Sequence, residues 1–164
     1  QVDRLLIKLN EFQPEQIIYV AGGGPFGRFH DKKWKDHEWA WQVSFLTPAR
    51  LLHWAGGQKQ LKQFIVIGSS VAEDNPDPNA ASYASAKHAL KGLVTSVQKE
   101  DPPFDLRLFS PSYMDTDMLP PSSWPRREGL KLRDPNEIAR EFWDWALNDD
   151  GPKHFRYESP IQGE

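Results

Sequence analysis

The chain has 164 residues, which suits one domain with a hydrophobic core of moderate size. Its net charge is −3 and neither sign is concentrated in one stretch, so we expect it to bind neither nucleic acid nor a membrane surface. Cysteine is absent, which excludes disulfide bonds and thiolate metal sites, and we expect a reducing, cytoplasmic location.

The first third of the chain predicts a helix, a strand and a second helix. Apolar residues at helical spacing predict an amphipathic helix at residues 2–12. A short apolar run at residues 17–21 leads into glycines and predicts a buried strand. Residues 35–55 predict a long helix, which ends before two consecutive glycines.

The rest of the chain continues this alternation. A buried strand is predicted at 64–67, a third strand at 106–109, and a last strand at 154–157. One helix is predicted at 79–99, capped by Asn79, and another from 135 onward, capped by Asp134. Residues 119–133 predict a long loop, either a functional lid or an exposed connection. Strands that alternate with helices predict an α/β fold with a doubly wound parallel sheet, Rossmann-like, in one domain over residues 1–164.

The glycine-rich segment 22–27 matches the G-x-G-x-x-G pattern of a dinucleotide phosphate loop. That loop requires a preceding strand, a helix that starts within it, and an acidic residue about 20 positions later. The strand is predicted, but Pro25 interrupts the start of a helix, and the segment about 20 positions on contains no acidic residue. We therefore expect segment 22–27 to bring bare backbone close to a ligand or to another strand.

Tyr83 and Lys87 lie four positions apart on a predicted helix, so they share one face, and that face is apolar. Lysine is rarely buried without a function or a partner. A nearby cation lowers the pKa of a tyrosine, which can then exchange a proton with a carbonyl or an alcohol. Ser70, at the end of a predicted strand, can hydrogen-bond the same substrate oxygen. The alternative is a tyrosine at the helix edge beside a lysine that extends to solvent.

These residues resemble the short-chain dehydrogenase/reductase family. The segment YASAK matches the family's Tyr-x-x-x-Lys motif, and IGSSVA matches the strand end that carries its serine. The resemblance implies that Tyr83 is the catalytic acid and base and that Ser70 positions the substrate. It also implies that Lys87 lowers the pKa of Tyr83 and binds the nicotinamide ribose. The resemblance covers residues 2–147.

Two further segments resemble the family's contacts with a nicotinamide cofactor, NAD or NADP. The segment YVAGG is similar to the family's Asn-Asn-Ala-Gly, with Ala21 and Gly22 matching. The segment LFSPSYMDTDM is similar to its Pro-Gly segment, with Pro111 matching, Ser112 in place of glycine, and Thr116 beside the carboxamide. The family's phosphate loop has no counterpart here. We therefore expect a partial fold that lacks the first βαβ units and, by itself, binds no dinucleotide tightly.

Ser44 stands where the family has an asparagine, within the predicted long helix. In the family, the backbone carbonyl at this position holds a water molecule of the proton relay. Pro48 lacks an N–H, so it leaves the carbonyl four residues earlier, that of Ser44, without its donor. The water site can therefore survive the substitution. The alternative is a kink that only shapes packing.

The resemblance implies an NAD(P)-dependent oxidoreductase that moves hydride between the nicotinamide and a small carbonyl or alcohol substrate. The rival interpretation is a non-catalytic binding or regulatory subunit that retains the sheet. Because family members commonly pair through the helices that here carry Trp39 and Ala89, the resemblance also implies a homo-oligomer. The five histidines show no paired ligand spacing, so we expect no metal site.

Overall fold

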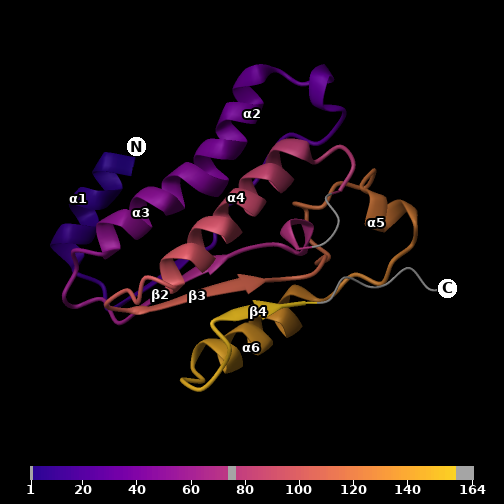
Figure 1. Cartoon of the computed structure of the whole chain (residues 1–164). Coiled ribbons are helices and arrows are strands. Elements are labelled where there is room, and N and C mark those ends of the chain that lie inside the picture. The colour runs from indigo at the N-terminus through magenta and orange to yellow at the C-terminus, as the bar shows by residue number, and fades with distance from the viewer. Residues whose placement is uncertain (1, 74–76, 158–164) are drawn as a thin grey trace.

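The centre of the structure, a computed structural model that describes residues 2–73 and 77–157, is a parallel sheet (Figure 1). Its four strands lie in the order β1-β2-β3-β4, and every neighbouring pair is parallel. Their bounds are β1 Gln16–Tyr19, β2 Gln63–Ile67, β3 Asp105–Ser110 and β4 His154–Arg156. The predicted α/β fold with a parallel, Rossmann-like sheet is confirmed.

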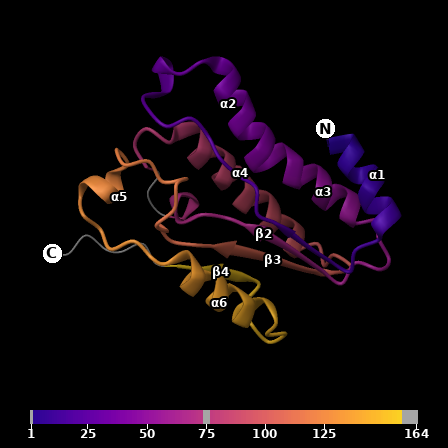
Figure 2. The same cartoon turned by 180° about the vertical axis from the view of Figure 1, so that it is seen from behind.

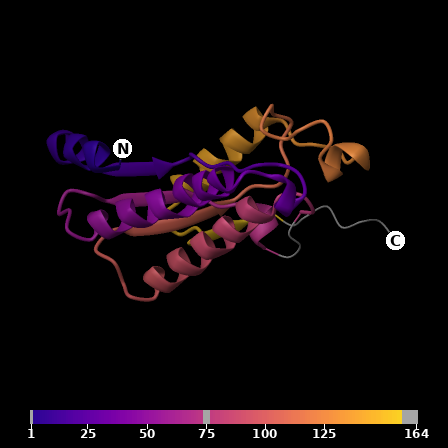
Figure 3. The same ribbon diagram turned by 90° about the horizontal axis from the view of Figure 1, so that it is seen from above.

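Helices cover both faces of the sheet. Helices α2 (Trp34–Trp41), α3 (Thr47–Ala55) and α4 (Ala81–Gln98) lie on one face, and α6 (Pro135–Ala146) lies on the other (Figures 1 and 3). Helix α1 (Val2–Phe12) packs beside α3, as Figure 2 shows from behind. Among the described residues, no helix is both long enough and apolar enough to cross a membrane.

The two middle strands alternate between two apolar clusters, one on each face. Phe64 and Val66 of β2 and Leu108 of β3 are fully buried in the cluster under α3 and α4. Ile65 and Phe109 point the opposite way and pack against α6. Successive residues of a strand point to opposite faces, so a strand covered on both sides requires a continuous apolar run. This is why the short apolar runs of the sequence were sufficient to locate the sheet.

The two predicted helix caps have different outcomes. Asp134 caps α6, because its side chain accepts a hydrogen bond from the Asn136 N–H at 2.8 Å. The predicted cap at Asn79 is wrong, since Ala80 holds the cap position of α4 and no side chain caps it. Asn79 instead adopts a positive φ of 67°, which asparagine tolerates, and its carbonyl accepts a hydrogen bond from the Gly27 N–H at 2.8 Å. This hydrogen bond connects the turn before α4 to the glycine-rich segment.

The helix predicted at residues 35–55 forms, but not as one regular α-helix. A π-turn at Gln42–Leu46 separates α2 from α3, with the Thr47 N–H bonded to the Gln42 carbonyl five residues earlier. In that register the missing N–H of Pro48 would have pointed to the carbonyl of Val43. The Tyr19 hydroxyl donates to this carbonyl at 2.6 Å instead. The backbone carbonyl that lacks its helical donor is thus that of Val43, whereas the sequence predicted that of Ser44, one residue later.

The long connection after β3 is held by its own polar contacts. It contains the short helix α5 (Trp124–Arg127), and Met114 forms a β-bridge with Arg133. The Arg126 guanidinium donates to the Leu119 carbonyl at 3.0 Å and to the Asp115 carboxylate at 2.7 Å. These contacts fold the connection over the carboxyl ends of the strands.

Candidate active site

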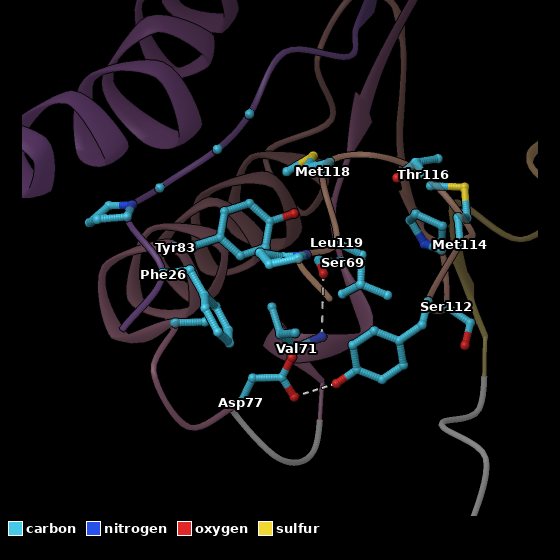
Figure 4. A pocket seen from close by; sticks show the side chains of 18 of the residues that line it. Phe26, Ser69, Val71, Asp77, Tyr83, Ser112, Met114, Thr116, Met118 and Leu119 are labelled. Atoms are coloured by element: carbon cyan, nitrogen blue, oxygen red, sulfur yellow. Dashed lines mark hydrogen bonds between the residues drawn. The ribbon is translucent and has the colours of Figure 1, made fainter. Parts of the chain in front are cut away.

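A cavity of about 330 Å³ lies at the carboxyl ends of β1, β2 and β3 (Figure 4). Parallel strands end at the same edge of a sheet, so the loops that follow them meet there. The cavity is lined by residues of the three loops 22–26, 69–77 and 111–120, together with Trp39 from α2 and Ala80 and Tyr83 at the start of α4. The site therefore combines segments that are far apart in the sequence.

Lys87 is buried behind the cavity, with 2% of its surface exposed. Its ammonium donates a hydrogen bond to the Ile67 carbonyl at 2.7 Å and lies 5.6 Å from the centre of the Tyr83 ring. Four residues of an α-helix bring two side chains to the same face, so this proximity follows from the spacing. Burial lowers the pKa of Lys87 to about 8, because the charged form loses its water. The alternative of a lysine that extends to solvent is excluded by this burial.

The pKa of the Tyr83 hydroxyl is raised in this structure. Burial is the main cause, the Ser69 hydroxyl acts in the opposite direction, and the Asp77 carboxylate adds to the increase. The prediction of a lowered pKa is therefore wrong for this structure. Desolvation dominates, and the Lys87 ammonium donates its hydrogen bond to the Ile67 carbonyl.

Of the two consecutive serines after β2, Ser69 lines the cavity with Tyr83. Its Oγ accepts a hydrogen bond from the Val71 N–H at 3.4 Å, which begins a short 3-10 turn at Ser70–Ala72. Ser70, the predicted substrate-positioning residue, is 3% exposed, and its N–H donates to the Pro111 carbonyl at 3.0 Å. The structure thus brings Ser69, not Ser70, into the lining beside Tyr83.

The glycine-rich segment after β1 brings bare backbone against the α4 side chains. A Cβ added at Gly22 would lie 3.1 Å from the Lys87 Nζ, and one added at Gly24 would lie 3.1 Å from the Tyr83 Cβ. Both distances are tighter than ordinary contacts, so neither position accommodates a side chain without displacement. The segment thus makes a close backbone approach, as expected, but to side chains of helix α4, where a ligand or another strand was predicted.

Ser44 fixes the position of this glycine-rich segment. The side chain is fully buried, and its Oγ accepts a hydrogen bond from the Gly23 N–H at 3.1 Å and donates one to the Gly23 carbonyl at 3.1 Å. Ser44 lies within the π-turn, and its short hydroxyl side chain makes both bonds. The side chain of Ser44 thus contacts backbone that lines the cavity, although Ser44 does not line it.

The residues that the family resemblance assigns to the cofactor divide into two groups. Gly22, Tyr83, Pro111, Ser112 and Thr116 line the cavity. Lys87 does not line it but lies directly against Gly22. Ala21 also lies outside it and faces a separate groove beside α1. The predicted strand at 17–21 ends at Tyr19, so Ala21 already belongs to the loop.

Two polar residues of the lining were not predicted from the sequence. Asp77 accepts a short hydrogen bond from the Tyr113 hydroxyl. Burial raises the pKa of Asp77, and burial together with the Asp77 contact raises the pKa of Tyr113 well above its ordinary range. The two residues lie 36 positions apart, and no local pattern connects them. The only sequence signal is the position of Tyr113 within the segment that follows β3.

The sequence model of the short chain dehydrogenase family matches residues 15–125, which is more than half of the chain. The chain belongs to the short-chain dehydrogenase family. The match includes Tyr83, Lys87 and both serines after β2, but it ends before α6 and β4. A search of curated protein sequences finds no significant match.

Solved structures share the fold of this chain at low sequence identity. A short-chain dehydrogenase from Streptomyces avermitilis has a TM-score of 0.75 and 15% identity over 94% of this chain and 64% of its own. An alcohol dehydrogenase from Thermococcus sibiricus, complexed with 5-hydroxy-NADP, has a TM-score of 0.72 and 21% identity over 99% and 71%. A 4-hydroxyisoleucine dehydrogenase, complexed with NADH and succinate, has a TM-score of 0.73 and 16% identity over 96% and 73%.

The chain thus spans 64% of the length of the Streptomyces dehydrogenase. Its four-stranded sheet is a partial Rossmann-like fold relative to these longer chains. The likeness shows the fold of the short-chain dehydrogenases.

Proposed function

We propose that this short-chain dehydrogenase transfers hydride between a nicotinamide cofactor, NAD or NADP, and a carbonyl or alcohol, with Tyr83 as acid and base. The observation that supports this most strongly is the buried Lys87 ammonium beside Tyr83 at the edge of a cavity. Among the described residues its hydrogen-bond acceptor is a backbone carbonyl, not a carboxylate. A buried cation with a perturbed pKa beside a cavity is typical of functional sites.

The lining of the cavity fits the nicotinamide end of such a cofactor. The bare backbone of Gly22 leaves space beside Lys87 that a Cβ would fill. We propose that Lys87 and Gly22 hold the ribose end and that Pro111, Ser112 and Thr116 hold the carboxamide end. The nicotinamide, when bound, supplies or accepts the hydride. Two of the solved relatives contain nicotinamide nucleotides, which supports this proposal.

The protein itself would supply the proton for the substrate oxygen. Because its pKa is raised, Tyr83 is protonated at neutral pH and can donate to a carbonyl oxygen that gains hydride. Ser69 lies in the same lining, so its hydroxyl can hydrogen-bond that oxygen and position it. Oxidation of an alcohol needs the deprotonated Tyr83, so this reaction should accelerate as pH rises. We therefore propose that Tyr83 is in the correct protonation state for carbonyl reduction near neutral pH, whereas alcohol oxidation requires higher pH.

Replacing Tyr83 by phenylalanine tests the proposal, in the protein expressed from its complete gene. The ring still packs, so folding should be kept, whereas turnover should fall by about 10²- to 10⁴-fold, the usual contribution of a general acid. The measurement is consumption of NADH or NADPH with a panel of ketones. Tyr157→Phe is a matched control, because Tyr157 lies outside the cavity lining.

Two results would contradict this function. Near-normal turnover in Tyr83→Phe would mean that the proton has another source. Cofactor binding by the wild type without any turnover on the panel would favour the non-catalytic subunit instead.

A further inference from the structure

Asp77 is the one charged side chain among the described residues that line the cavity. It lies in the loop between β2 and α4 and is half-buried, and its carboxylate accepts a hydrogen bond from Tyr113. Figure 4 shows this hydrogen bond on the far side of Val71 from the Tyr83 hydroxyl. The cavity therefore has a second polar end, separate from the end at which a substrate would react.

The wall between the two polar ends is apolar. Phe26, Val71 and Leu119 line it, and in Figure 4 their side chains lie around the middle of the cavity, where the Ser69 hydroxyl is the polar group. Such a wall favours an apolar body in any ligand that extends from one end to the other. It offers no cation to neutralise an anionic group on the ligand.

A carboxylate that already accepts one hydrogen bond can accept more. Its two oxygens provide about four lone-pair positions, and Tyr113 uses one of them. A hydroxyl on the ligand could therefore donate to Asp77. A ligand carboxylate or phosphate at the same place would face a like charge in a poorly solvated site, which is strongly unfavourable.

We propose that Asp77 and Tyr113 determine substrate specificity in this cavity. The substrate would be an apolar carbonyl or alcohol that carries a second hydroxyl at the end remote from the reacting oxygen, and substrates with an anionic group there would be rejected. The assignment of the reacting end rests on the proposed function of Tyr83. The assignment of the remote end rests on the Asp77–Tyr113 pair.

Binding to this chain, without turnover, tests the remote end separately from the reaction. The probes are 4-hydroxyacetophenone, 4-methoxyacetophenone and 4-acetylbenzoate, which share one body and differ in the remote group. Ligand-observed NMR gives their affinities. The hydroxyl probe should bind the wild type about tenfold more tightly than the methoxy probe, since a hydrogen bond to a charged group contributes about that much. The carboxylate probe should bind most weakly.

Two variants test the separate contributions of Asp77 and Tyr113, and a third variant is a control. Asp77→Asn keeps the shape and removes the charge, so the carboxylate probe should approach the affinity of the methoxy probe. Tyr113→Phe frees the carboxylate oxygen, so the hydroxyl probe should bind at least as tightly as before. Asp117→Asn is the matched control, because Asp117 is exposed on the same connection and does not line the cavity. It should leave all three affinities unchanged.

The inference fails if the three probes bind the wild type equally, or if the hydroxyl probe shows no binding up to its solubility limit. It also fails if the carboxylate probe stays equally weak in Asp77→Asn. Loss of selectivity with normal turnover would overturn this inference alone. Normal selectivity in a protein without turnover would overturn the proposed reaction and retain the binding site.

Discussion

Two buried cations in this domain have opposite surroundings. Arg107 on β3 is 1% exposed, and its guanidinium binds the Asp105 carboxylate at 2.5 Å and the carbonyls of Trp145 and Asn148 at 2.8 Å each. It also lies 5.5 Å from the centre of the Trp145 ring. Lys87 on α4 is equally buried, but the acceptor that the structure shows for it is the Ile67 carbonyl.

The difference separates a structural charge from a functional one. The planar guanidinium satisfies several acceptors at once and links β3 to the end of α6, so its burial is compensated. The Lys87 ammonium has fewer acceptors to replace the water that it loses on burial, and its pKa is lowered to about 8 as a result. Glu73 resembles Arg107 in having several partners: its side chain is 1% exposed and contacts Lys91, Ser110 and His154. These partners outweigh burial, so the pKa of Glu73 is lowered.

The largest expected effect on stability is that of Arg107→Met. This change removes a charged donor from the Trp145 and Asn148 carbonyls, which keep only backbone donors, and removes a buried partner of Asp105. The free energy of unfolding should therefore fall by about 3–5 kcal/mol. Chemical denaturation measures it. The control is Lys153→Met, which removes an exposed partner of the same carboxylate and should cost less than about 1 kcal/mol. Equal losses in both variants would mean that Arg107 is not the structural cation we describe.

Lys87→Met should instead raise the free energy of unfolding at neutral pH. The folded protein releases the Lys87 proton at about pH 8, whereas the unfolded chain holds it until about 10.5. Below pH 8 the wild type therefore carries the full cost of burying the charge, about 3 kcal/mol, and this cost disappears as pH rises toward 10.5.

Denaturation of both proteins at about pH 7 and about pH 9.5 tests this, since both values lie below the ionisation of unfolded tyrosines at about 10. The variant should be the more stable protein at the lower pH, and the difference should shrink at the higher pH. A difference that does not change with pH would show that Lys87 is not desolvated in the folded protein.

Ser44→Ala should have the smallest effect of the three. Ser44 is as buried as the two cations but neutral, and it makes two hydrogen bonds to the backbone of Gly23. Removing its hydroxyl should lower the free energy of unfolding by about 1–2 kcal/mol. Turnover of the complete protein should fall less than about tenfold, because the side chain acts on the loop and not on the reacting atoms. A loss as large as that of Tyr83→Phe would place the Ser44 hydroxyl in the proton pathway.

Local patterns in the sequence determined most of the strands, one helix cap and the placement of two site residues on one helix face. Apolar runs located β1 and β2 and most of β3, because a strand covered on both faces has no polar side to interrupt the run. The four-residue spacing placed Tyr83 and Lys87 on one apolar face, and Asp134 was identified as a cap from its neighbours alone. In each case the interaction that decides the outcome spans a few residues, so the sequence contains it completely.

The tertiary structure decided the properties that depend on distant segments. Which of two consecutive serines lines the cavity depends on how the chain turns where it leaves β2, and spacing alone indicated Ser70 when the structure places Ser69 there. The raised pKa of Tyr83 depends on burial by loops that are separated in the chain. The Asp77–Tyr113 pair exists only because the loops after β2 and β3 meet at one edge of the sheet. Desolvation and long-range hydrogen bonds arise when the fold closes, so no local pattern records them.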